Sequence, residues 1–198
     1  MTDTFYPDVS NHNPGVNLTG SKLVMAKATE GTSYVDPTYL GVKRWCAFNH
    51  ATIAAYHFLH AGKGAAQAVS CRSVVCDDVP IMVDVEPTGT SMPVLADVMA
   101  FVNEARLVGH KVHLVYLPHW YWQQIGSPNL GVLPKNGLHL VSSNYTTYSD
   151  TGLGWASYGG VAPSIWQYTD RQLLNGQLVD FNAFKGDLTA LKSVMFNG

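Results

Sequence analysis

Apolar segments alternate with amphipathic segments along most of this chain. Apolar runs at residues 23–28 and 51–58 are each followed by a stretch in which apolar residues recur at three- and four-residue spacing, and residues 94–108 are the clearest such stretch. Strands that alternate with helices form βα units, which favour a parallel sheet with helices outside it. The alternation therefore predicts an α/β fold.

The expected elements are few for a complete (β/α)₈ barrel. We expect strands at residues 5–9, 23–28, 51–58, 80–86, 110–116, 138–142, 164–168 and 178–181, and helices at 39–49, 65–75, 94–108 and 188–195 with a short turn or helix at 120–124. A full barrel takes about 250 residues, whereas this chain has 198. We therefore predict a flattened, incompletely closed TIM-like β/α barrel with about eight strands and about five helices. Pro7 supports incomplete closure, because proline has no amide donor for a strand ladder.

The composition excludes several classes of protein. Hydrophobic residues make up 46% of the chain, charged residues 13%, and the formal net charge is −2. With no run of like charges, a nucleic-acid partner is not expected, and no stretch reaches the ~18 apolar residues that membrane insertion needs. The odd number of cysteines favours free thiols, with a Cys71–Cys76 pair as the alternative. We expect one domain over residues 1–198.

Residues 81–87 combine a buried strand with two carboxylates. Strand side chains alternate between faces, so Asp84 and Glu86 lie on the face opposite Val83 and Val85, with Cα atoms roughly 6.5–7 Å apart. Like charges this close raise a carboxyl pKa, which creates an acid that works near neutral pH. Paired carboxylates at the end of a barrel strand are typical of a glycosidase. The alternative is that both acids only cap the helix that follows.

Other strand ends carry acids and aromatic residues. Asp8 and Asp180 lie within apolar strand segments, so a barrel would bring them to the mouth that holds Asp84 and Glu86. For any one acid, a capping or salt-bridge role is the alternative. Sugars stack on aromatic faces, and aromatic residues at or beyond strand ends are Tyr6, Tyr56, Phe58, Tyr116, Trp120, Trp122, Trp166 and Tyr168. Their alternative role is to fill the core.

Metal and cofactor motifs are not expected. His57 and His60 have a spacing that suits metal ligands on a helix, but this segment is predicted to be a strand. The chain has no Gly-rich phosphate loop and no Gly-x-Ser-x-Gly elbow. We therefore expect neither a bound metal nor an organic cofactor.

An ordered set of motifs resembles a known family. The motifs are Asp8-Val9-Ser10, Lys27-Ala28-Thr29-Glu30-Gly31, Tyr34 with Asp36-Pro37, Tyr56-His57-Phe58, Asp84-Val85-Glu86, Tyr116, Trp166-Gln167-Tyr168-Thr169 and Asp180-Phe181-Asn182. In this order they resemble glycoside hydrolase family 25, the Chalaropsis-type lysozymes, over residues 5–186. Two departures are Pro7, where an aliphatic residue usually precedes the aspartate, and Ser142-Ser143, where a tryptophan is expected near outer sugar subsites.

The resemblance implies a peptidoglycan hydrolase that cleaves between N-acetylmuramic acid and N-acetylglucosamine. It implies that Glu86 is the general acid and that Asp84 orients the 2-acetamido group, which attacks the anomeric carbon. Asp8 and Asp180 are implied to complete the catalytic pocket. The implied substrate contacts are Tyr56, Tyr116, Trp166, Tyr6 and Asp36.

The resemblance also implies a partner and a setting. The partner is the glycan strand of bacterial peptidoglycan, bound by a monomer whose single catalytic domain has no separate cell-wall-binding module. The first residues show no signal peptide, so we expect a phage-type endolysin that stays in the host cytoplasm until a holin-type exit, or an extracellular enzyme released by another route. The alternatives are another hexosaminidase, such as a chitinase-like enzyme, and a catalytically inactive barrel that binds glycans.

Overall fold

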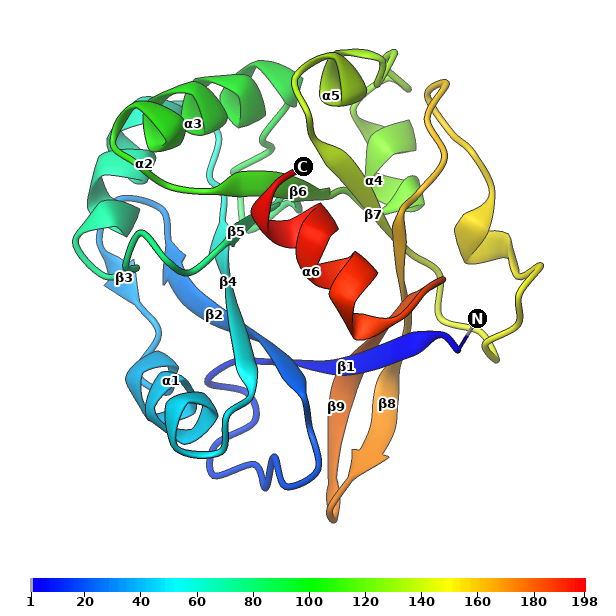
Figure 1. Cartoon of the computed structure of the whole chain (residues 1–198). Coiled ribbons are helices and arrows are strands. Elements are labelled where there is room, and N and C mark those ends of the chain that lie inside the picture. Colours follow the sequence, from blue (N-terminus) through cyan, green and yellow to red (C-terminus); the bar gives the residue numbers. More distant parts are fainter. Residues whose placement is uncertain (1) are drawn as a thin grey trace.

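A nine-stranded sheet organises the computed structural model, which describes residues 2–198 (Figure 1). The strands are β1 Thr4–Val9, β2 Leu23–Glu30, β3 Tyr34–Val35, β4 Thr52–Phe58, β5 Ile81–Asp84, β6 Val112–Tyr116, β7 His139–Ser143, β8 Ile165–Leu174 and β9 Gln177–Phe184. The helices are α1 Tyr39–Phe48, α2 Gly64–Arg72, α3 Leu95–Leu107, α4 His119–Gln124, α5 Val132–Lys135 and α6 Leu188–Phe196, with a 3₁₀ turn, η1, at Leu153–Trp155.

Eight of the strands form a ring. The order is β1-β9-β8-β7-β6-β5-β4-β2, β1 also pairs with β2, and β3 is attached beside β2. The ring closes through only two residue pairs, Asp8 with Met25 and Val9 with Ala26. This ladder begins directly after Pro7, which has no amide hydrogen to offer a neighbouring strand. The predicted β/α barrel is confirmed, and its closure is short.

Within the ring, one strand runs against the predicted parallel direction, and outside it the short β3 is antiparallel to β2. β9 is antiparallel to both β1 and β8, so the expectation of a wholly parallel sheet is wrong there. The cause is the turn Asn175-Gly176, where both residues have positive φ, 46° and 97°. A two-residue turn of this kind favours an antiparallel hairpin. The hairpin also makes β8 and β9 longer than the predicted strands at 164–168 and 178–181.

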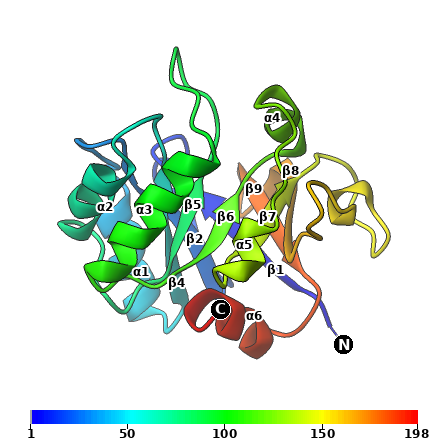
Figure 2. The same ribbon diagram turned by 90° about the horizontal axis from the view of Figure 1, so that it is seen from above.

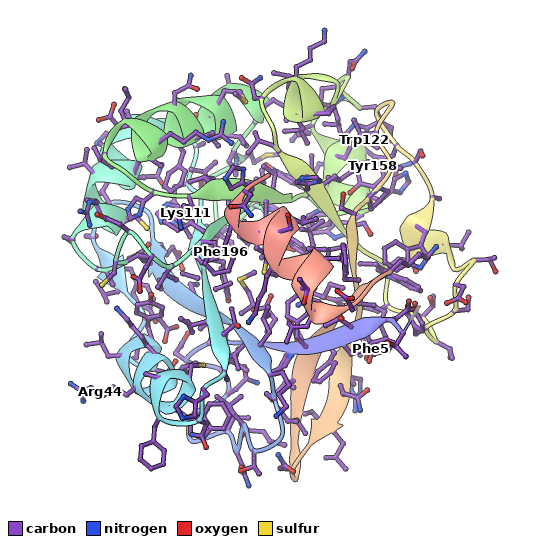
Figure 3. The ribbon with its side chains drawn as sticks, in the orientation of Figure 1. Phe5, Arg44, Lys111, Trp122, Tyr158 and Phe196 are labelled. Atoms are coloured by element: carbon purple, nitrogen blue, oxygen red, sulfur yellow. The ribbon has the colours of Figure 1, made fainter. Side chains whose placement is uncertain are left out.

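The core has an inner and an outer part. Met25, Met82 and Leu114 fill the inside of the ring together with Leu191 and Met195 of α6. Helix α6 covers one end of the ring (Figure 2). The loop that projects after β5 lies on the opposite side, as does helix α4. Near the end of α6, the Lys111 ammonium group lies 5.3 Å from the centre of the Phe196 ring (Figure 3). The carboxyl ends of the parallel strands lie at the other end of the ring.

The outer core fixes the orientation of β5. Ile81, Val83 and Val85 lie in the apolar layer between the sheet and the helices, whereas Met82 lies inside the ring. This is the alternation that the sequence predicts for residues 81–86. The face of Met82 is thus the face that leads to Asp84.

Helices α2 and α3 lie unusually close together. A Cβ atom on Gly64 would come within 2.6 Å of the Asp97 carbonyl oxygen, so only glycine fits this crossing. The Asp97 carboxylate accepts hydrogen bonds from the amides of Val94 (2.9 Å) and Gly62 (2.8 Å), which starts α3 where the periodicity predicts it. None of the helices in residues 2–198 is long and apolar enough to cross a membrane.

The shortest elements were not predicted. Strand β3 has two residues and helix α5 has four, and neither length is enough to show a hydrophobic period.

All three cysteines are free thiols: Cys46 and Cys71 are buried, and Cys76 is exposed. The preference for unpaired thiols is therefore confirmed.

Candidate active site

A pocket of about 370 Å³ opens at the carboxyl ends of the parallel strands. Its lining is mostly polar and comes from seven of the eight ring strands and from the loops after β1, β5 and β7. The lining residues are Asp8, Val9, Ser10, His12, Asn13, Lys27, Tyr56, Phe58, Met82, Asp84, Glu86, Tyr116, Tyr145, Gln167 and Asp180. All four predicted acids, together with Tyr56 and Tyr116, therefore meet in one place.

Strand β5 delivers two of the acids. Asp84 is the last residue of β5, and Glu86 follows two residues later. The Val85 amide donates to the Tyr116 carbonyl oxygen at 2.9 Å, so the pairing with β6 continues past the end of β5. Because this keeps the strand-like alternation, Asp84 and Glu86 both face the pocket.

The other two acids are brought together by β1 and β9. Asp8 is paired with Asp180 across the antiparallel ladder. Opposite residues in such a ladder project from the same face of the sheet. The sequence places Asp180 in the cluster correctly but for an incomplete reason, because β9 runs antiparallel and Asp180 lies in its middle rather than at a carboxyl end.

Burial and mutual repulsion hold protons on these carboxyl groups. Burial is the largest cause of the raised pKa of Asp8, and the charges of Asp180 and Glu86 raise this pKa further. Burial also raises the pKa of Asp84 well above its usual range, with Glu86 and Asp8 acting in the same direction. The sequence predicts raised pKa values from like charges, and burial is the larger physical cause.

Glu86 and Asp180 show the same direction of shift. Burial raises the pKa of Glu86 and Asp180 adds to it, while the Tyr116 hydroxyl and Lys27 act in the opposite direction. The pKa of Asp180 is raised to about 6 by burial and then by Asp170, against the effect of His12. Near neutral pH the cluster therefore holds protons that exposed carboxyl groups would have released.

One oxygen of Asp84 is left without a partner. The Asp84 side chain is only 7% exposed, yet its Oδ1 atom has no hydrogen-bond partner among residues 2–198. A buried oxygen without a partner costs about 1–3 kcal/mol. Since Asp84 lines the pocket, this unsatisfied acceptor lies beside the space that a ligand would occupy.

Lys27 is the cation of the pocket. Its Nζ atom lies 2.6 Å from Glu30 Oε2 and 4.8 Å from the centre of the Phe58 ring. Its charge lowers the pKa of both Asp84 and Glu86, against the larger effect of burial. The Lys27 ammonium group therefore limits how far these two acids hold their protons.

Two tyrosines hold the amide of Gln167. The hydroxyls of Tyr116 and Tyr145 donate to Gln167 Oε1 at 2.9 and 2.8 Å. With its oxygen occupied, Gln167 presents its Nε2 atom to Asp180 Oδ2, 3.5 Å away. The side chain of Gln167 is 5% exposed, so this network forms a fixed wall of the pocket.

Trp166 does not line this pocket, so its expected contact with the substrate is corrected. It is fully buried, with 0% exposure, and its Nε1 atom donates to the Asn144 carbonyl oxygen at 2.8 Å. Its ring lies against Gly152 and Gly154, where an added Cβ would come within 2.6 and 2.1 Å of ring atoms. Trp166 and Gln167 are neighbours on β8, so when Gln167 faces the pocket Trp166 faces away.

Tyr6 and Asp36 also lie outside the pocket lining. Tyr6 is 1% exposed in the inner core below the acids, so direct substrate contact is not supported. Asp36 accepts hydrogen bonds from the amides of Asn11 and Thr38, both at 2.9 Å, and from Thr38 Oγ1 at 2.6 Å. It therefore fixes the loop that carries Ser10 and His12 and acts on the pocket only through that loop.

The two histidines considered as metal ligands have other partners. His57 is fully buried, its Nδ1 atom lies 2.8 Å from Thr29 Oγ1, and its Nε2 atom lies 3.2 Å from Gln67 Oε1. Burial lowers the pKa of His57 to about 4, so it is neutral at physiological pH. His60 Nε2 lies 2.9 Å from Glu30 Oε1. Both rings therefore take part in the protein's own hydrogen bonding.

Lys27, Tyr145 and Gln167 were not singled out as site residues from the sequence. Lys27 and Gln167 stand within motifs that carry the family resemblance, and the alternation of β8 places Gln167 and Trp166 on opposite faces. This two-residue alternation does not determine which face of β8 points into the barrel. Tyr145 lies in the loop after β7, where the sequence has no periodic signal.

Comparisons with known proteins agree with this geometry. Residues 7–177 match the family described as Glycosyl hydrolases family 25. The N,O-diacetylmuramidase of Chalaropsis sp. is 29% identical over 218 residues, an alignment that covers 94% of this chain and 96% of that protein. Two solved structures share the fold. The family GH25 lysozyme from Aspergillus fumigatus has a TM-score of 0.80 and 23% identity, covering 99% of this chain and 100% of that one. The CTP1L endolysin has a TM-score of 0.67 and 20% identity, covering 96% of this chain and 69% of that one.

The family match covers the strands that deliver Asp8, Asp84 and Glu86 to the pocket. The ordered motifs, the barrel and the buried carboxyl cluster all agree with this match. The chain therefore belongs to glycosyl hydrolases family 25, the Chalaropsis-type lysozymes, and it is a glycoside hydrolase.

Proposed function

We propose that this enzyme hydrolyses the β-1,4 bond of peptidoglycan between N-acetylmuramic acid and N-acetylglucosamine. The observation that carries the proposal is the buried carboxyl cluster at the mouth of the barrel, in which Glu86 has a raised pKa. An acid of this kind donates a proton to a leaving oxygen. The relative named N,O-diacetylmuramidase supports the choice of a muramyl substrate.

The proposed first step is substrate-assisted. Glu86 gives its proton to the glycosidic oxygen as the bond from that oxygen to the anomeric carbon breaks. The acetamido oxygen of the muramyl residue forms a bond to the same carbon, and Asp84 accepts a hydrogen bond from the acetamido N–H. The unpartnered Oδ1 atom of Asp84 supports this role.

The proposed second step returns the enzyme to its starting state. A water molecule attacks the anomeric carbon, the bond to the acetamido oxygen breaks, and Glu86 takes one proton from the water. Because the nucleophile belongs to the substrate, the spacing of the enzyme's carboxylates does not predict the stereochemistry. We propose that Asp8 and Asp180 maintain the charge of the cluster, and that Tyr56 and Tyr116 contact the reacting sugar.

The decisive experiment is digestion of purified peptidoglycan, followed by mass spectrometry of the soluble fragments after borohydride reduction. We expect muramic acid at the new reducing ends. Glucosamine at those ends would instead identify a chitinase-like hexosaminidase. Binding to the glycan without any release of fragments would identify an inactive glycan-binding barrel.

We further propose a setting for the activity: lysis of a bacterial host by a phage-type endolysin that waits in the host cytoplasm for a holin-type exit. The likeness in fold to the CTP1L endolysin supports this setting. We propose that residues 1–198 act as one catalytic domain and as a monomer. A neighbouring gene for a small membrane protein is the expected genomic context, whereas a fungal genome or a secretion pathway would contradict the proposed setting.

A further inference from the structure

A second groove adjoins the catalytic pocket at Tyr145. We call it the Tyr145 groove. Its volume is about 530 Å³, and its lining comes from two segments, residues 145–148 and residues 168–172. Tyr145 lines both the groove and the catalytic pocket, so the two spaces adjoin at this side chain.

The walls of the Tyr145 groove are already in place without a ligand. The Thr146 amide donates to the Tyr168 carbonyl oxygen at 3.0 Å, which ties the loop after β7 to β8. The Tyr145 hydroxyl is tied to Gln167, while the residue as a whole is 51% exposed. Tyr148 packs edge-on against Phe5, with ring centres 4.9 Å apart. A ligand therefore meets rigid tyrosine rings and loses little affinity to their ordering.

The lining of the groove includes a cation. Arg171 is exposed, and its guanidinium group makes no hydrogen bond or ion pair with any residue in the range 2–198. Its backbone is held by a hydrogen bond from the Arg171 amide to Thr169 Oγ1, at 3.0 Å. Asp170 lies next to it in the lining and adds one negative charge. The groove thus offers both signs of charge beside aromatic faces.

A third groove, which adjoins the catalytic pocket at Asn13, has a different lining. It has a volume of about 300 Å³ and contains no charged side chain in its lining. Apolar residues and a tryptophan dominate it, including Val16, Leu18, Val42 and Trp45. Of these two grooves, as formed by residues 2–198, the Tyr145 groove is the one that offers a cation to an anionic substituent.

We propose that the Tyr145 groove binds the peptide stem of the muramyl residue whose bond is cleaved. This inference rests on the proposed function, which places a muramyl residue in the catalytic pocket. The stem is a short peptide on the lactyl group of that residue, and it carries carboxylates and usually one amino group. Arg171 attracts the stem carboxylates, and Asp170 attracts the amino group.

The test compares two substrates that differ only in the stem. One is peptidoglycan with intact stems, and the other is the same glycan after an amidase has removed the stems. In Arg171→Ala we expect the ratio of kcat/KM for the first substrate over the second to fall roughly 3- to 10-fold, which is the range for one exposed charged contact. In the control Arg44→Ala, which removes an exposed arginine of α1, the ratio stays unchanged (Figure 3).

The outcomes separate this inference from the proposed function. If the wild-type enzyme cleaves neither substrate, the proposed function fails. If it cleaves both and Arg171→Ala leaves the ratio at the wild-type value, only the stem site is wrong. In Arg171→Glu the charge is reversed, so we expect the ratio of kcat/KM values to fall further than it does in Arg171→Ala.

A binding measurement gives a readout without turnover. A muramyl peptide is titrated into Glu86→Gln by calorimetry, and then into Glu86→Gln combined with either Arg171→Ala or Arg44→Ala. We expect a weaker Kd only with Arg171→Ala, and a smaller difference at high salt because the contact is exposed. An equal Kd in all three proteins would overturn the proposal.

Discussion

Asp8 and Asp180 are directly opposite partners on the antiparallel strands β1 and β9. They are 172 positions apart in the chain and still form one side of the catalytic pocket. Each is buried enough that its pKa is raised. The β8–β9 hairpin therefore helps to build the pocket, because the register of β9 against β1 places Asp180 beside Asp8.

Removing the proposed proton donor should abolish most of the turnover. We expect Glu86→Gln to lower kcat roughly 10²- to 10⁴-fold, because glutamine has no proton to donate to the leaving oxygen. The thermal unfolding midpoint should change little, because the substitution preserves the size of the side chain. Turnover is measured by the release of reducing ends from peptidoglycan. The control is Glu104→Gln on α3, outside the pocket lining. Wild-type turnover in Glu86→Gln would remove Glu86 from the mechanism.

Asp180 should make stability depend on pH. Its pKa rises from an ordinary 3.8 to about 6, so the folded protein binds this proton more tightly than the unfolded chain does. The resulting stabilisation is complete below the unfolded pKa and is lost as the pH rises through about 6. Asp180→Asn should therefore match the wild type at about pH 4 and exceed it at about pH 7, by up to ~3 kcal/mol in free energy of unfolding.

Urea unfolding at both pH values measures this difference. Groups such as His57, whose pKa is lowered to about 4, titrate in both proteins and cancel from the comparison. The control is Asp78→Asn, an exposed carboxylate outside the pocket. A constant difference between Asp180→Asn and the wild type across this pH range would contradict the raised pKa.

A negative charge at Gln167 should move the pH profile of catalysis. In Gln167→Glu a fifth carboxylate faces Asp180 and the hydroxyl of Tyr116, so the remaining acids hold their protons to higher pH. We expect the alkaline limb of kcat/KM to shift upward by roughly one unit. The matched control is Gln123→Glu, which adds the same charge at an exposed position on α4. Identical profiles for the two variants would show that Gln167 has no influence on the acid cluster.

The packing of Trp166 can be tested through a glycine. An added Cβ at Gly154 would lie 2.1 Å from Trp166 Nε1, so Gly154→Ala must displace the ring or the segment around η1. We expect a loss of about 1–3 kcal/mol in free energy of unfolding. Gly41→Ala in α1 is the control: it meets nothing within 4 Å, and it should add about 0.5–1 kcal/mol through helix propensity. Equal stability of the two variants would show that Trp166 is not tightly covered.

The order of strands and helices could be predicted from the sequence because it depends on local periods. The strand at residues 81–86 shows this best: its alternation places Val83 and Val85 on one face and Asp84 on the other, and the structure confirms both faces. Helix α3 likewise follows from the spacing of its apolar residues. The prediction of eight ring strands, and of one shared site for the four acids, came from such local signals together with the family resemblance.

The sequence by itself therefore determined the βα order, the identity of the acids and their placement at the mouth of a barrel. Only the tertiary structure decided that β9 runs antiparallel, that Gln167 rather than Trp166 faces the pocket, and that Tyr145 belongs to it. A period of two residues distinguishes two faces of a strand without saying which one lies inside. That choice depends on contacts between distant segments, because burial of Trp166 beneath Gly152 and Gly154 turns Gln167 inward.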